Sequence, residues 1–170
     1  MKKVFIDGSA GTTGLRIFDR LRERTDLQLL TLPEAERKLE ASRRRLLNEA
    51  DVVFLCLPDD AAREAASWVE NPDTVVLDTS TAHRTAPGWC YGFPELSPVQ
   101  EARLRQAKRI AVPGCHASGF IALVYPLVSA GLLKPDALLS CYSLTGYSGG
   151  GKKMIAEYRA PARSALLNAP

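Results

Sequence analysis

The sequence lacks any apolar run that approaches the ~20 residues needed to span a bilayer. It also lacks the apolar core of a signal peptide, because the run at residues 4–6 ends at Asp7 and the glycines behind it. Both absences lead us to expect a cytoplasmic protein without membrane association.

Cysteine is sparse and unevenly spaced, with no Cys-x-x-Cys pair among the four residues Cys56, Cys90, Cys115 and Cys141. This spacing indicates neither a zinc site nor a disulfide framework, so we expect no bound metal. In a reducing compartment each cysteine would be a free thiol. The question is then which thiol is reactive.

Excess charge is also absent, since the net charge is only +3 and charged residues make up 24% of a chain that is 46% hydrophobic. The densest basic run, residues 43–45, has no aromatic residues interleaved with it, and we interpret it as a solvated helix face. A nucleic-acid partner is therefore not expected. The composition is that of an ordinary globular domain.

Short β-rich runs alternate with helix-prone stretches along most of the chain. Strands are expected at residues 4–6, 27–32, 52–57, 75–77 and 109–112, and helices near residues 15–21, 34–50, 59–69, 99–107 and 117–130. Short connections between alternating elements predict a doubly wound parallel sheet with helices on both faces, an α/β fold of Rossmann type.

The character of the chain changes after Lys134. We expect a dinucleotide-binding domain over residues 1–134, and residues 135–170 to begin a second, incomplete α+β domain for substrate binding or dimerisation. Residues 137–147 resemble a longer strand, and a basic helix start follows three glycines. One strand and part of a helix cannot bury a core of their own.

A glycine-rich turn separates the first expected strand from the first expected helix. Its glycines follow a G-x-x-G-x-x-G spacing, a variant of the dinucleotide fingerprint. Glycines permit a tight turn and let backbone N–H groups approach a pyrophosphate at the positive end of the helix. A turn of this kind can also serve packing alone, but its setting favours binding. The candidate cofactor-binding residues are Gly8, Ser9, Gly11, Thr12, Thr13 and Gly14.

The end of the second expected strand bears on which nicotinamide cofactor binds. An NAD site usually has an acid there, and Glu34 is close to that position. Arg37 and Lys38 follow it and could meet a 2′-phosphate. We favour NADP(H) over NAD.

Cys115 follows an expected strand and begins an apolar helix, directly after Pro113 and Gly114. Ligands of open α/β sheets gather at the carboxyl ends of strands, and the positive end of a helix favours a thiolate. The alternative is a small buried filler, the role that we expect for Cys56 and Cys141 inside apolar strands.

The remaining candidates at this stage are weaker. Cys90 is left undecided between a buried and a reactive role. We interpret His83 as a surface residue, and His116 as structural because neighbouring side chains at a helix start diverge by about 100°.

Several segments together resemble N-acetyl-γ-glutamyl-phosphate reductase of the shorter type, an arginine-biosynthesis family related to aspartate-semialdehyde dehydrogenase. These segments occur in order over most of the chain, and only the ordered set is specific. They are the glycine loop and residues 78–84 (DTSTAHR), 91–96 (YGFPEL), 113–115 (PGC) and 146–152 (GYSGGGK).

The resemblance implies an NADPH-dependent reduction of an acyl phosphate to a semialdehyde with release of phosphate. It implies that Cys115 forms a thioester, that Arg84 holds the substrate phosphate, and that Ser148 and Gly149 lie beside the cofactor. The family's catalytic histidine would lie beyond Pro170, so we expect this chain alone to be inactive. A homo-oligomer is expected because a half-built domain exposes apolar surface.

Three alternatives remain open at this stage. The acyl phosphate could be aspartyl or aminoadipyl phosphate, or the chain could be a dinucleotide-binding fragment without chemistry. A third reading compares residues 146–153 with a phosphate-binding loop for nucleoside triphosphates. Lys153 stands where such a loop needs Ser or Thr to hold Mg²⁺, so this reading is disfavoured.

Overall fold

The computed structural model describes residues 1–160, apart from the side chains of residues 147, 148, 152 and 153. The chain divides into two compact units after Leu139. The first unit holds a six-stranded sheet whose order is β2-β1-β3-β4-β6-β5, with every neighbouring pair parallel. The strands are β1 (Lys2–Asp7), β2 (Leu27–Leu30), β3 (Val52–Leu55), β4 (Val75–Asp78), β5 (Cys90–Tyr91) and β6 (Arg109–Ala111).

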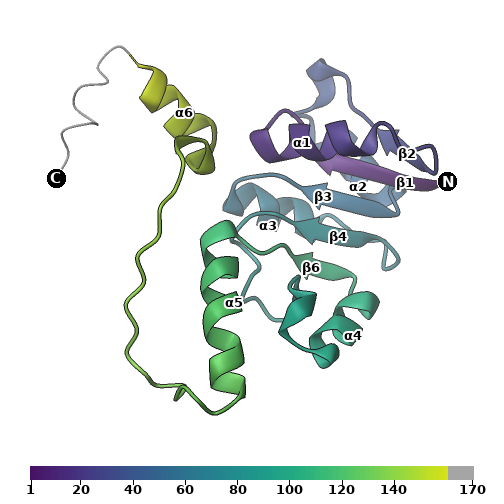
Figure 1. Cartoon of the computed structure of the whole chain (residues 1–170). Coiled ribbons are helices and arrows are strands. Elements are labelled where there is room, and N and C mark those ends of the chain that lie inside the picture. The colour runs from purple at the N-terminus through teal and green to yellow at the C-terminus, as the bar shows by residue number, and fades with distance from the viewer. Residues whose placement is uncertain (161–170) are drawn as a thin grey trace. The chain divides into compact units, whose positions relative to one another are not determined.

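Helices connect these strands and cover both faces of the sheet (Figure 1). Right-handed crossovers place α1 on one face, because the chain moves from β1 outward to β2, and α2 and α3 on the other, because it then moves through β3 to β4. The predicted doubly wound α/β fold is confirmed. The helices of this unit are α1 (Thr12–Leu21), α2 (Glu40–Glu49), α3 (Asp59–Ser67), α4 (Pro98–Gln106) and α5 (Cys115–Ser129), with short 3₁₀ turns η1 (Glu34–Glu36) and η2 (Pro94–Leu96).

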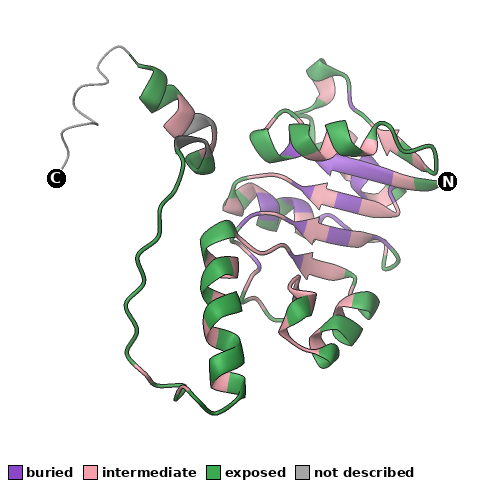
Figure 2. Cartoon of the chain, in the orientation of Figure 1, coloured by how far each residue is buried: buried purple, intermediate pink, exposed green. Residues whose placement is uncertain are grey.

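The core lies between the sheet and the helices α2 and α3. Leu47, Val53, Leu55 and Val76 are fully buried there, and Trp68 closes the cluster at the end of α3. In contrast, α1 buries only Gly14, and α5, within the described residues, buries none of its side chains (Figure 2). Packing against α2 and α3 therefore anchors the sheet.

Two details of the first unit differ from the sequence prediction. The helix expected over residues 34–50 is interrupted, because η1 ends at Glu36 and α2 begins at Glu40; Ser42 Oγ donates to the Glu36 carboxylate across the break at 2.8 Å. The two-residue strand β5 was not predicted. It pairs with β6, a segment distant in sequence, and lies in a loop rich in proline and glycine.

The second unit contains the 3₁₀ turn η3 (Tyr147–Gly150) and helix α6 (Gly151–Arg159). The strand predicted over residues 137–147 is wrong, since residues 137–146 form no strand in the described part of the chain. A strand needs a partner backbone to satisfy its N–H and C=O groups, and Leu138 and Tyr142 are almost wholly exposed. No helix of the described residues is long and apolar enough to cross a membrane.

The core predicts a contrast between two leucine substitutions. We expect Leu55→Ala to lower the free energy of unfolding by about 2–5 kcal/mol, because it leaves a cavity at a side chain that is 0% exposed. Leu39→Ala is the matched control, at a side chain that is 53% exposed, and should change that free energy by less than about 1 kcal/mol. Urea unfolding followed by tryptophan fluorescence measures both, and equal losses would contradict the assigned core.

Candidate active site

The glycine loop lies where the direction of strand connection reverses, between β1 and β3. Gly8 follows β1 and has a φ of +86°, a conformation that favours glycine. A Cβ on Gly8 would lie 2.2 Å from the carbonyl oxygen of Cys56, which follows β3, and one on Gly14 would lie 2.4 Å from the carbonyl oxygen of Gly8. Two close backbone approaches therefore require glycine. Open α/β sheets bind ligands at this crevice.

The loop then leads directly into α1. Gly11 N–H donates to the Gly8 carbonyl at 2.9 Å, which closes the turn, and Gly11 is the N-cap of the helix. No side chain caps α1 and no acidic residue lies in its first turn, which begins with Thr12 and Thr13. The N-terminal amides and the positive end of the helix are thus available to an anion.

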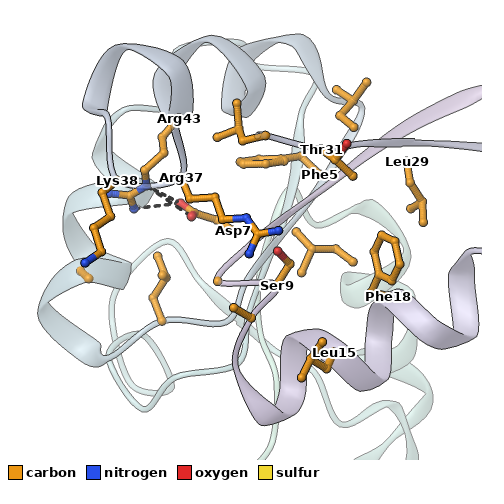
Figure 3. Close-up of a pocket in the computed structure, with 17 residues that line it drawn as sticks. Phe5, Asp7, Ser9, Leu15, Phe18, Leu29, Thr31, Arg37, Lys38 and Arg43 are labelled. Carbon is orange, nitrogen blue, oxygen red and sulfur yellow. Dashed lines mark hydrogen bonds and ion pairs between the residues drawn. The ribbon is translucent and has the colours of Figure 1, made fainter. Parts of the chain in front are cut away.

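A cavity of about 790 Å³ lies beside this loop (Figure 3). Gly8, Ser9 and Ala10 line one side, together with the ends of β1 and β2. Arg37 and Lys38 also line it, and the Arg37 side chain reaches toward Ser9. Glu34 is not among the lining residues. The cavity therefore combines apolar walls, a glycine-rich edge and cationic groups.

Arg43 contributes a buried ion pair to this cavity. Its Nη2 lies 2.8 Å from Asp7 Oδ2, and its guanidinium lies 4.8 Å from the centre of the Trp68 ring. The prediction of a solvated basic face is wrong for Arg43, whose side chain is 13% exposed, and right for Arg45, whose side chain is 60% exposed. The Arg43 guanidinium therefore offsets the negative charge of Asp7 at the edge of the cavity.

Cys115 is the first residue of α5 and is exposed. The preceding turn is fixed at both ends: Val112 N–H donates to the Asp78 carbonyl at 2.8 Å, and the Gly114 carbonyl accepts from Ser118 Oγ at 2.7 Å. The structure thus places this thiol outside the core, at the start of a 15-residue helix that follows β6.

Arg84 lies against the same turn. Its Nε donates to the Val112 carbonyl at 3.2 Å, and a Cβ built on Gly114 would lie 2.5 Å from Arg84 Nη1. The guanidinium therefore packs on the backbone immediately before Cys115. A side chain at position 114 would displace it. The fold brings together a thiol and a cation that are 31 positions apart in sequence.

The interpretation of His83 as a surface residue is wrong. His83 is 8% exposed, its Nδ1 lies 2.6 Å from Asp78 Oδ2, and its ring stacks on Trp89 with the ring centres 3.9 Å apart. His116, by contrast, is exposed at the start of α5. Sequence reasoning missed Asp78 as well. The available signal was its place as a charged residue at the end of an otherwise apolar strand.

The other three cysteines differ from one another. Cys56 is half-buried after β3, and burial raises the pKa of its thiol to about 11. Cys90 is buried on β5, 3.5 Å from Gln100 Nε2. Cys141 is exposed, so its expected place inside an apolar strand is wrong.

The two remaining candidates, Ser148 and Gly149, lie in the second unit. Gly149 is in η3, and its N–H donates to the carbonyl of Gly146, the residue before η3, at 2.8 Å. The side chain of Ser148 is outside the described residues. Their proximity to a cofactor stays a prediction.

The fold and the glycine-edged crevice define an α/β domain of the Rossmann type that binds dinucleotides. The family described as "Semialdehyde dehydrogenase, NAD binding domain" matches residues 31–104. The solved structure of aspartate semialdehyde dehydrogenase II from Vibrio cholerae, in complex with ASA, superposes on this chain with a TM-score of 0.65 at 18% identity. The match covers 100% of this chain and 54% of the Vibrio chain. Aspartate semialdehyde dehydrogenase from Francisella tularensis superposes with a TM-score of 0.60 at 18% identity. That match covers 92% of this chain and 48% of the Francisella chain. At such identities the likeness shows the fold alone.

Curated relatives share much more of the sequence with this chain than these solved structures do. N-acetyl-gamma-glutamyl-phosphate reductase 2 of Pseudomonas putida is 54% identical over 93% of this chain and 50% of its own length. The reductase of Rhizobium meliloti is 50% identical over 99% of this chain and 54% of its own. Over more than nine tenths of its length the chain is therefore similar to N-acetyl-γ-glutamyl-phosphate reductases. It spans about half the length of the curated relatives that it matches.

The burial of Cys56 predicts slow alkylation. Its pKa rises from an ordinary 9.0 to about 11, so near pH 8 its thiolate fraction should be about a hundredfold below that of an unshifted thiol. We expect iodoacetamide to modify Cys115 and Cys141 well before Cys56, as peptide mass spectrometry of a time course would show. Repeating the reaction in urea is the control, where Cys56 should react like the others. Equal rates in the folded protein would contradict the assigned environment.

Proposed function

We propose that this chain provides the cofactor-binding half and the nucleophile of an enzyme that reduces N-acetyl-γ-glutamyl phosphate to N-acetylglutamate 5-semialdehyde with NADPH. The observation that carries the proposal is the packing of Arg84 on Gly114, immediately before the exposed thiol of Cys115. A nucleophile beside a fixed guanidinium fits an acyl phosphate, whose carbonyl carbon accepts the thiolate and whose phosphate needs a cation. The relatives' names supply the particular acyl group.

In the proposed reaction, Cys115, Arg84 and the first amides of α5 have separate roles. The Cys115 thiolate attacks the acyl carbon, the bond from that carbon to the phosphate oxygen breaks, and phosphate departs from beside Arg84. When bound along the loop of Gly8, Gly11 and Gly14, NADPH would supply the hydride that reduces the thioester carbon. The carbon–sulfur bond then breaks, which releases the semialdehyde and returns the thiolate. The amides of Cys115 and His116, at the positive end of α5, are the candidate donors to the carbonyl oxygen that becomes negative.

The cofactor fits the crevice of the first unit. A Cβ would collide with backbone at Gly8 and Gly14, and Gly11 closes the turn between them. Ser9, Thr12 and Thr13 supply polar groups at the loop and the first turn of α1. Arg37 and Lys38 line the cavity, and Glu34 does not, which favours NADP(H) with its 2′-phosphate over NAD.

We also propose that this chain is part of a longer protein, in which its two parts have different roles. Residues 1–134 would bind the cofactor, and residues 135–170 would begin a substrate and dimerisation domain that also supplies the general acid or base. Ser148 and Gly149 would lie beside the cofactor. The assembly would be a homo-oligomer in the cytoplasm, where free thiols such as the exposed Cys115 and Cys141 stay reduced.

The role of Cys115 is tested in the complete protein. Cys115→Ser should lower the reductase rate by about a thousandfold or more, because a hydroxyl is a much weaker nucleophile. The dissociation constant for NADPH, followed by its fluorescence, should change less than about twofold. The assay runs phosphate-dependent NADP reduction with N-acetylglutamate semialdehyde. Cys141→Ser is the matched control. Retained activity in Cys115→Ser would contradict the assignment of Cys115 as the nucleophile. Faster turnover of aspartate semialdehyde than of N-acetylglutamate semialdehyde would contradict the proposed substrate.

The cofactor preference is tested by charge removal at the cavity. The double variant Arg37→Gln/Lys38→Gln should weaken NADPH binding by about tenfold or more and leave NADH binding unchanged, because only NADPH carries the 2′-phosphate. Arg45→Gln is the control for loss of a positive charge away from the cavity, since its side chain is 60% exposed and outside the cavity lining. Parallel losses for NADPH and NADH would contradict the assignment.

A further inference from the structure

Asp78 is a fully buried carboxylate for which the proposed chemistry has no direct role. It is the last residue of β4, between β3 and β6 in the centre of the sheet. Ser80 N–H donates to Oδ1 at 3.0 Å, Ser80 Oγ donates to Oδ2 at 2.7 Å, and His83 Nδ1 lies 2.6 Å from Oδ2. Since an ionised carboxylate only accepts hydrogen bonds, Nδ1 is the donor in the last contact. Three donors compensate the burial of the charge.

This carboxylate fixes the turn that carries Arg84. The His83 ring is held between the Asp78 contact at its edge and the stacked Trp89 ring on its face, with an interplanar angle of 13°. Ala86 N–H donates to the His83 carbonyl at 3.2 Å. The residue immediately before Arg84 is therefore immobilised by its side chain and by its backbone.

The main chain of Asp78 fixes the other half of the same arrangement. Its carbonyl accepts from Val112 N–H at 2.8 Å, and Val112 in turn accepts the Arg84 Nε–H bond. One residue thus sets the position of the arginine through its side chain and the position of the turn before Cys115 through its backbone. The distance between guanidinium and thiol depends on both.

We propose that Asp78 and His83 form a positioning pair that holds the Arg84 guanidinium beside Cys115. The hydrogen bond from His83 to Asp78 is the part of the pair that determines where Arg84 lies, and the Trp89 stack only supports the ring. This inference rests on the proposed function only for the identity of the anion that Arg84 binds. The contacts among Asp78, His83 and Arg84 are independent of that function.

The test measures the charge at Cys115 without any turnover. Iodoacetate is anionic and iodoacetamide is neutral, so a nearby cation raises the ratio of their rates at a given thiol. Peptide mass spectrometry gives this ratio at Cys115, and the exposed Cys141 in the same chain is the internal reference. Arg84→Gln should lower the normalised ratio by about threefold, the scale of a partly exposed charge pair.

His83→Phe keeps an aromatic ring on Trp89 and removes the donor to Asp78, and it should lower the ratio as much as Arg84→Gln does. The double variant should lower it no further, because both changes remove the same cation from the same place. His83→Asn, whose amide N–H can occupy the place of Nδ1, should restore most of the ratio. Asp78→Asn, which keeps the side-chain volume, is the second variant in case His83→Phe does not fold by circular dichroism.

Two results would overturn the proposal. One is a wild-type ratio in folded His83→Phe or Asp78→Asn together with a lowered ratio in Arg84→Gln, since the pair would then serve stability alone. The other is a wild-type ratio in Arg84→Gln itself. Absence of reductase activity in the complete protein would contradict the proposed function and would leave the alkylation result intact.

Discussion

The approach of Gly8 to the Cys56 carbonyl is the contact on which the proposed cofactor site depends. It brings the turn after β1 against the end of β3, at the point where successive connections diverge to opposite sides of the sheet. The missing side chain at Gly14 then lets the first turn of α1 rest on the same loop. Without these two approaches the helix would stand away from the sheet, and the crevice would lose the backbone edge that an anion can reach.

The turn before Cys115, our proposed nucleophile, depends on a different constraint, the buried Asp78. The carboxyl ends of β4 and β6 lie side by side, so the turns that follow them meet above the sheet. Arg84 comes from one turn and Cys115 from the other. The two proposed sites, one after β1 and one after β6, thus share a single edge of the parallel sheet, where open α/β folds bind ligands.

Most of the fold follows from local patterns. Runs such as residues 52–55 and 75–78 alternate with helix-prone stretches, and this alternation is enough to predict a parallel sheet. The errors occur where pairing or burial is not local. The strand β5 has only two residues, and residues 137–146 have apolar residues but no partner strand among the described residues. A sequence pattern indicates the tendency of a segment to adopt an extended backbone. A strand also needs a partner strand for its backbone hydrogen bonds.

The sequence by itself determined the glycine spacing, the Pro-Gly-Cys turn and the apolar helix behind it, because these are short-range features of neighbouring residues. Only the tertiary structure decided that His83 is buried on Asp78, that Arg43 pairs with Asp7, and that Arg84 packs on Gly114. The Arg43 and Arg84 contacts join segments that belong to different strands, whereas the His83 contact lies within the turn that follows β4. Charged and polar side chains carry no periodic signal for their partners, so their positions depend on which strand ends the completed sheet places together.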